Sequence, residues 1–153
     1  MSTIKKFLNL IFIDGLSGMA LGLFSTLIIG TILKQAADLI GGDFGYYLGI
    51  FAVMAQRLTG AGIGIGVAYK YKSSTYVTLS AAAAGMIGAY ATAIISGSIL
   101  SDGALVYSGP GDPLSAFIAA LAGIAVGSLP AGKTKLDLLI TPAVTIIAGG
   151  AVG

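Results

Sequence analysis

Gln56 and Arg57 form the polar pair whose position most suggests chemistry, because they interrupt a long apolar stretch. They stand between Leu48–Met54 and the glycine-rich run Gly60–Gly66. A charged side chain inside a membrane segment costs about 3 kcal/mol on insertion scales, and such a cost usually accompanies a function. Two interpretations stay open: the pair contacts a solute on a translocation path, or it serves assembly, with Arg57 pairing with Asp14 or extending to an interface.

The other charged candidates stand at the ends of apolar stretches, where a structural role is the simpler explanation. Asp14 opens the first stretch, and a carboxylate there would cap the amide groups at a helix start. Asp112 precedes Pro113 after a glycine-rich turn, which is a good position to begin a helix and to close over an external site. Residues 133–137 precede the last stretch, as membrane anchors do. All seven are kept as candidate contacts of a solute or its path: Arg57, Gln56, Asp14, Asp112, Lys133, Lys135 and Asp137.

The residue types that are missing narrow the chemistry further. The chain has no Cys, His, Glu or Trp, and all six acidic residues are Asp. Disulfides, thiolate metal sites, cysteine nucleophiles and the commonest proton shuttle are therefore excluded. We expect no metal, no cofactor and no self-contained catalytic site. The formal charge of +2 comes from lysines beside apolar segments, which favours membrane orientation over nucleic-acid binding.

Composition indicates what kind of element must position these residues. The mean hydropathy is +0.98 and only 9% of residues are charged, against about a quarter in soluble domains. Five apolar stretches stand between the charged clusters, and most have lengths near the roughly 20 residues that cross a bilayer. We therefore predict an all-α membrane protein, a single transmembrane domain over residues 1–153, with five spans near 15–33, 44–69, 76–100, 114–129 and 138–153.

The lysines predict how these spans are oriented. Residues 1–13 carry Lys5 and Lys6 among apolar neighbours, as a short amphipathic helix on the inner membrane face would. Further lysine pairs flank alternate segment ends, and such a side is cytoplasmic. We expect a cytoplasmic N-terminus, cytoplasmic loops at 70–75 and 130–136, and outer loops at 34–43 and 101–113. Because the last segment ends without a charged or aromatic flank, we expect this chain to be the N-terminal half of a longer protein.

Glycine is the expected packing residue, with 24 in the chain. Many fall four residues apart, a spacing that lets helix backbones approach closely in lipid. The run Gly60–Gly66 lacks the strand and acidic residue of a nucleotide loop, so we interpret it as a packing face with local unwinding. Together with Pro142, it predicts a broken or re-entrant helix. The helix-packing glycines are Gly18 with Gly22, Gly60 with Gly64, Gly62 with Gly66, Gly123 with Gly127, and Gly149 with Gly153.

Three stretches resemble the phosphotransferase-system enzyme IIC membrane family, which also includes membrane proteins of the perfringolysin-regulator type. They are Phe12–Gln35, Gly109–Ala120 and Gly132–Asp137 with Thr141–Pro142. The resemblance implies a sugar-translocating subunit in the bacterial cytoplasmic membrane, usually a homodimer and about twice this length. In such systems a cytoplasmic enzyme IIB carries the phosphate on Cys or His and passes it to the sugar. This chain departs from the family's sugar sites, which use a Glu and a His.

The resemblance leaves two alternatives to a phosphotransferase-linked sugar permease. One is a membrane regulatory protein of the same family that does not transport, and the other is a small-solute transporter that is not coupled to phosphotransfer. A soluble partner with a phosphorylatable Cys or His would separate the permease from both. The bilayer, a sugar or other small solute, and enzyme IIB are the expected partners.

Overall fold

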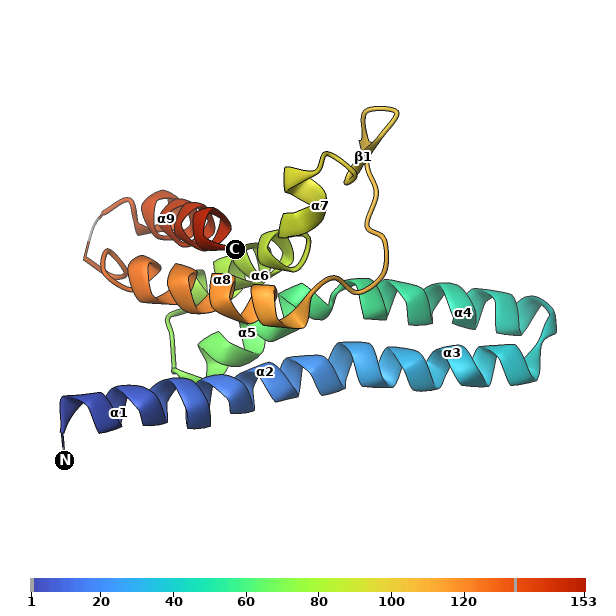
Figure 1. Ribbon diagram of the computed structural model, residues 1–153, viewed down its shortest axis with the longest axis horizontal. Coiled ribbons are helices and arrows are strands. Elements are labelled where there is room, and N and C mark those ends of the chain that lie inside the picture. The colour runs from blue at the N-terminus through green and yellow to red at the C-terminus, as the bar shows by residue number, and fades with distance from the viewer. Residues whose placement is uncertain (1, 134) are drawn as a thin grey trace.

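One long helix dominates the N-terminal part of the chain in the computed structural model, which describes residues 2–133 and 135–153 (Figure 1). It runs without a break over Thr3–Ile40, a length of 38 residues. Two π-helical segments divide it into five parts: α1 (Thr3–Asn9), η1 (Leu10–Gly15), α2 (Leu16–Leu23), η2 (Phe24–Ile28) and α3 (Ile29–Ile40).

The continuity of this helix corrects three expectations. A separate interfacial helix over 1–13 is wrong, because no proline or glycine pair stops the helix before the first span. Asp14 is not a helix cap, since it lies inside η1. The loop at 34–43 is wrong as well: the helix continues to Gly41, which ends it with a φ of 64°, and the Lys34–Asp38 ion pair bridges its last turns.

The second expected span is two helices in the structure. α4 (Gly42–Arg57) and α5 (Thr59–Lys70) meet at Leu58 and are bent by 52° relative to each other. The sequence predicted a broken helix, but it placed the unwinding at Gly60–Gly66. That run is helical throughout, and the break lies just before it.

The third expected span, 76–100, is wrong in its second half. α6 (Thr75–Ala89) is interrupted at Tyr90, and α7 (Ala91–Ile95) ends before Gly97, whose φ is 76°. A short antiparallel hairpin of β1 (Leu100–Ser101) and β2 (Ala104–Leu105) follows. α8 (Pro113–Gly127) and α9 (Asp137–Val152) begin within a residue of the expected 114–129 and 138–153, and Pro142 lies inside α9.

α5 is the centre of the packing, with α2 on one face and α6 on another, while α8 and α9 cover α6 (Figure 1). Alternate glycines of α5 serve the two faces. A Cβ at Gly18 would lie 2.5 Å from the carbonyl oxygen of Gly66 on the α2 face, and a Cβ at Gly60 would lie 2.7 Å from that of Gly85 on the α6 face. The glycine spacing thus brings helix backbones into direct contact.

α8 and α9 meet each other in the same way. A Cβ at Gly123 would lie 2.7 Å from the carbonyl oxygen of Thr145, and one at Gly149 would lie 2.7 Å from that of Ala119. The buried apolar core between these helices contains Ile63, Val67, Val77, Phe117 and Ile124.

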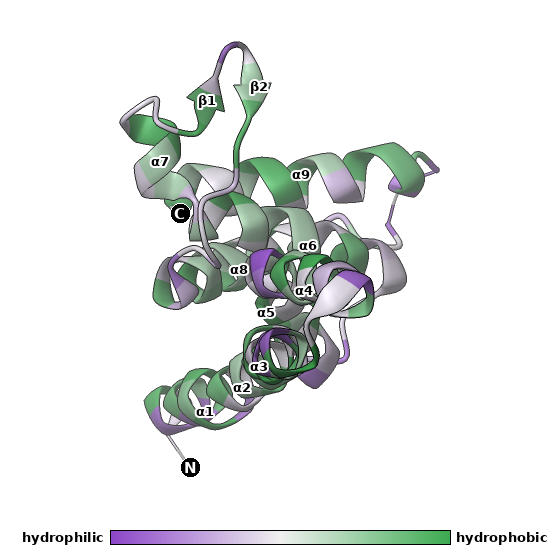
Figure 2. Cartoon of the chain, turned by 90° about the vertical axis from the view of Figure 1, so that its right-hand side faces the viewer, coloured by the Kyte–Doolittle hydropathy of each residue, from purple (hydrophilic) through white to green (hydrophobic). Residues whose placement is uncertain are grey.

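Apolar side chains also cover much of the outside of the molecule. In Figure 2 the helices are green over most of their length, while purple is concentrated in turns and at a few helix positions. Thr3–Ile40 is long and apolar enough to cross a membrane, and the α4–α5 pair passes the same test if it is one span. α6, α8 and α9 are apolar but shorter. The structure therefore supports a nearly all-α protein and leaves five crossings as a prediction.

Candidate functional site

A π-helical segment of the first helix and the breaks in two other helical segments meet beside Arg57. η2 in the first helix lies against the α4–α5 break, because the Oγ1 atoms of Thr26 and Thr59 are 3.4 Å apart. The α6–α7 interruption at Tyr90 adjoins the same place, with the Tyr90 hydroxyl 3.4 Å from the carbonyl oxygen of Arg57. We call the group formed by Thr26, Gln56, Arg57, Thr59 and Tyr90 the break site.

The polar side chains of the break site are held by short hydrogen bonds. The Thr59 hydroxyl, which is fully buried, donates to the carbonyl oxygen of Gln56 at 2.6 Å. The Thr26 hydroxyl donates to the carbonyl oxygen of Gly22 at 2.6 Å, and the Gln56 amide donates to the Thr31 hydroxyl at 3.1 Å. Such bonds occupy carbonyl oxygens where the regular helical ladder is disturbed, and π segments of this kind are frequent at functional sites.

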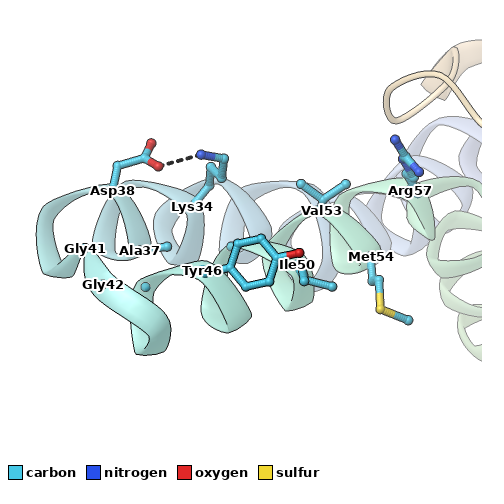
Figure 3. Close-up of a pocket in the computed structure, with 12 residues that line it drawn as sticks. Lys34, Ala37, Asp38, Gly41, Gly42, Tyr46, Ile50, Val53, Met54 and Arg57 are labelled. Atoms are coloured by element: carbon cyan, nitrogen blue, oxygen red, sulfur yellow. Dashed lines mark hydrogen bonds and ion pairs between the residues drawn. The ribbon is translucent and has the colours of Figure 1, made fainter.

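Arg57 stands at one end of an open groove of about 610 Å³ between α3 and α4 (Figure 3). The Lys34–Asp38 ion pair, at 2.6 Å, lies at the other end, and apolar side chains such as Ile50 and Val53 lie between. Arg57 is exposed and occupies the last turn of α4, where a cation opposes the negative end of the helix dipole. The groove therefore brings an exposed guanidinium group to the edge of the break site.

The expected pairing of Arg57 with Asp14 is wrong. Within residues 2–133 and 135–153, the structure contains only the Lys34–Asp38 ion pair. A Cβ at Gly30 would touch Gln56, so Arg57 lies near the level of Gly30 on the first helix. Asp14 is 16 residues earlier, which is about 24 Å of helix rise.

Asp112 anchors the loop that contacts Ala89 and Tyr90 beside the break site. Its carboxylate caps α8 by accepting from the Leu114 amide at 3.0 Å and from the Ser115 hydroxyl at 2.6 Å. The hydrogen bond from the Ser115 hydroxyl, with help from the Leu114 and Ser115 amides, lowers the pKa of Asp112 against the opposing effect of burial. The Asp112 amide donates to the carbonyl oxygen of Ala89 at 2.8 Å, and the Tyr90 hydroxyl donates to that of Gly109 at 2.5 Å.

The remaining candidates lie at the other end of the molecule. Lys133 and Lys135 are exposed in the α8–α9 connection, and Asp14 is exposed on the first helix. Asp137 begins α9, where its carboxylate accepts from the Gly132 amide at 3.0 Å and from the Thr141 hydroxyl. The structure thus brings Gln56 and Arg57 together with the Asp112 loop and leaves the other four apart.

Sequence reasoning did not identify Thr26, Thr59 or Tyr90. Tyr90 carried a signal, because it is the only aromatic residue between Tyr76 and Tyr107 in an otherwise apolar stretch. The two threonines carried none, since threonine is ordinary in membrane helices. Their role follows from the contact between η2 and the break at Leu58.

Comparison with known protein families identifies the family of this chain. The family described as phosphotransferase system, EIIC matches residues 13–153. The chain belongs to the phosphotransferase system EIIC family. EIIC proteins are membrane-embedded components of the sugar phosphotransferase system, so the resemblance of the three sequence stretches is confirmed. Searches of curated proteins and of solved structures gave no match.

Proposed function

We propose that this EIIC chain translocates a sugar across the bacterial cytoplasmic membrane as part of a phosphoenolpyruvate-dependent phosphotransferase system, and that the break site contacts the sugar. The observation that carries the assignment of the site is the meeting of η2, the α4–α5 break and the α6–α7 interruption around Arg57. Interrupted helices expose backbone polar groups inside a membrane protein, and transporters place substrates there.

The chemistry of the break site suits a neutral, hydroxyl-rich solute. Arg57 provides hydrogen-bond donors, the Gln56 amide can donate and accept, and the Tyr90 and threonine hydroxyls can do both. Thr59 and Tyr90 are buried, so water competes weakly for their hydroxyls, while Arg57 is exposed and can reach a solute in the groove.

The phosphate must come from a partner, because the chain has neither Cys nor His. A cytoplasmic enzyme IIB carrying phosphate on one of those residues would supply it. The lysine-bearing ends of the helices would face that partner if the positive side is cytoplasmic. Lys133 and Lys135, in the exposed α8–α9 connection, are then the candidates for contact with enzyme IIB or with a leaving phosphosugar. We also propose a homodimer, as is usual in this family.

Replacing Arg57 tests the assignment. In cells that express the full-length protein with its phosphotransferase partners, Arg57→Gln should reduce uptake of the labelled sugar at least tenfold, because the guanidinium donors are lost. Arg57→Lys should recover part of the uptake, since it restores a charge but not the planar donor set. A panel of labelled sugars, with phosphoenolpyruvate supplied, identifies the substrate first.

Asp43→Asn is the control, because it removes one exposed charge in the first turn of α4, outside the lining of the groove. Its uptake should equal that of the wild type, and the membrane yield of all variants should be similar. Wild-type uptake by Arg57→Gln at normal yield would remove Arg57 from the sugar path. Failure of every sugar to accumulate in the wild type would instead favour a regulatory protein of the same family.

A further inference from the structure

A cleft of about 660 Å³ opens at the lysine-bearing end of the molecule, far from the break site. Its walls come from the first helix, through Phe7, Leu10 and Ile11, and from α8, through Leu121 and its neighbours. The turn Tyr71–Ser74 between α5 and α6 completes the lining. In Figure 1 the N-terminus, this turn and the α8–α9 connection all lie at the left end.

Specific contacts hold the cleft in shape. The Tyr71 hydroxyl donates to the carbonyl oxygen of Leu10 at 3.0 Å, which ties the turn to the first helix. Tyr71 also lies over Gly15, where a Cβ would come within 2.6 Å of the hydroxyl oxygen. Lys72 follows with a φ of 53°, a left-handed conformation that is unusual for lysine. The turn is therefore fixed against the helix, with Lys72 at the edge of the cleft.

The lining combines two chemistries. Its walls are mostly apolar, while its polar residues are Tyr71, Lys72, Ser73, Ser74 and Ser128. A sugar would leave its own hydroxyls unpaired against the walls, and inorganic phosphate would use the polar groups alone. A phospholipid has both parts, a phosphodiester and acyl chains.

The charge around the cleft favours an anionic headgroup. Five further lysines lie on the segments that converge here, and all are exposed: Lys5, Lys6, Lys70, Lys133 and Lys135. The carboxylates on these segments are Asp14 and Asp137, and Asp137 already accepts hydrogen bonds from Gly132 and Thr141. Basic pockets between membrane helices of this kind bind anionic lipid headgroups.

We propose that this cleft binds one anionic phospholipid. Its phosphodiester contacts Lys72 and the neighbouring serine hydroxyls, and an acyl chain lies along Leu10, Ile11 and Leu121. The site is independent of the sugar path, because it shares no residue with the break site. The lysines around the cleft then attract an anionic lipid, in addition to orienting the protein in the membrane.

The absence of tryptophan from the chain allows a direct test. Phe7→Trp places one fluorophore in the lining, and Phe12→Trp places one on the same helix outside it; both phenylalanines are exposed. Each variant of the 153-residue chain is reconstituted in bilayers that contain brominated phosphatidylglycerol or brominated phosphatidylcholine at the same mole fraction. Bromine quenches tryptophan only at close range, so quenching reports which lipid lies next to each position.

Phe7→Trp should be quenched preferentially by the phosphatidylglycerol, and Phe12→Trp equally by both lipids. Adding Lys72→Gln to Phe7→Trp should lower the preference about fivefold, the effect of about 1 kcal/mol per lysine near a membrane surface. Lys34→Gln, at the far end of the molecule, should leave it unchanged. Equal quenching of Phe7→Trp by the two lipids would overturn the proposal. Relief of the preference by millimolar inorganic phosphate would overturn it too, since the site would then bind free phosphate.

Discussion

At the scale of single residues, Asp112 makes structural contacts through both its side chain and its backbone. Its carboxylate caps α8, and its amide fastens the loop to the end of α6 at Ala89. The sequence predicted the cap, because Asp before Pro113 matches the geometry of a helix start. The sequence prediction failed for Asp14, because the first helix begins at Thr3, where Ser2 is the N-cap and accepts from the Lys5 amide, and Asp14 is internal to that helix.

We expect Asp112→Ala to lower the free energy of unfolding by about 1 kcal/mol, the usual cost of losing an N-cap. Asp112→Asn should retain most of it, because an amide oxygen also accepts from the Leu114 amide. Thermal unfolding in detergent near neutral pH measures both. Equal melting temperatures for the wild type and Asp112→Ala would show that the cap contributes nothing.

The stability that the Asp112 carboxylate contributes depends on pH. Hydrogen bonds hold its pKa in the folded state below the ordinary value of 3.8. The stabilisation by the ionised carboxylate is therefore fully present above about pH 4, and it is lost as the pH falls through the lower folded pKa. Asp112→Asn does not titrate there, so the difference in stability between it and the wild type should change only below about pH 4.

At the scale of helices, glycine spacing was readable from the sequence but the breaks were not. Gly60 and Gly64 face α6, while Gly62 and Gly66 face α2. Glycines four residues apart lie on the same face of a helix, so the spacing in the sequence predicts both pairs. The interruptions fall at Leu58 and Tyr90, which are not helix breakers. They depend on how neighbouring helices pack, and local propensity does not contain that information.

Gly64→Leu should disrupt the packing of α5 on α6. A Cβ at Gly64 would overlap the carbonyl oxygen of Ala81, and backbone cannot move aside as a flexible side chain can. We expect a loss of about 3 kcal/mol or more, seen as a lower melting temperature and an aggregated profile in detergent gel filtration. Ala20→Leu, at an exposed position of α2, is the control and should behave like the wild type. A normal profile for Gly64→Leu would contradict close backbone packing.

At the scale of the whole molecule, helix length decides where the break site lies relative to the bilayer. The first helix has 38 residues, or about 57 Å of rise, which is far more than the roughly 30 Å of hydrocarbon. From Lys6 to Gly30, the level of the break site, there are 24 residues or about 36 Å. If the lysines mark one interface, the break site lies near the opposite one, below the loop that Asp112 fastens.

The lysine asymmetry then makes a testable statement about which interface is which. Because the chain has no cysteine, single cysteines can report sidedness without background. Ser108→Cys lies in the exposed loop beside the break site, and Thr75→Cys lies next to the lysine-bearing turn. In right-side-out membrane vesicles, a membrane-impermeant thiol reagent should label Ser108→Cys at once and Thr75→Cys only after permeabilisation, because positively charged connections stay in the cytoplasm. The reverse pattern would mean that the orientation is inverted, with the break site facing the cytoplasm and the lysines facing outward. The path proposed through Arg57 would then begin on the side where enzyme IIB delivers its phosphate.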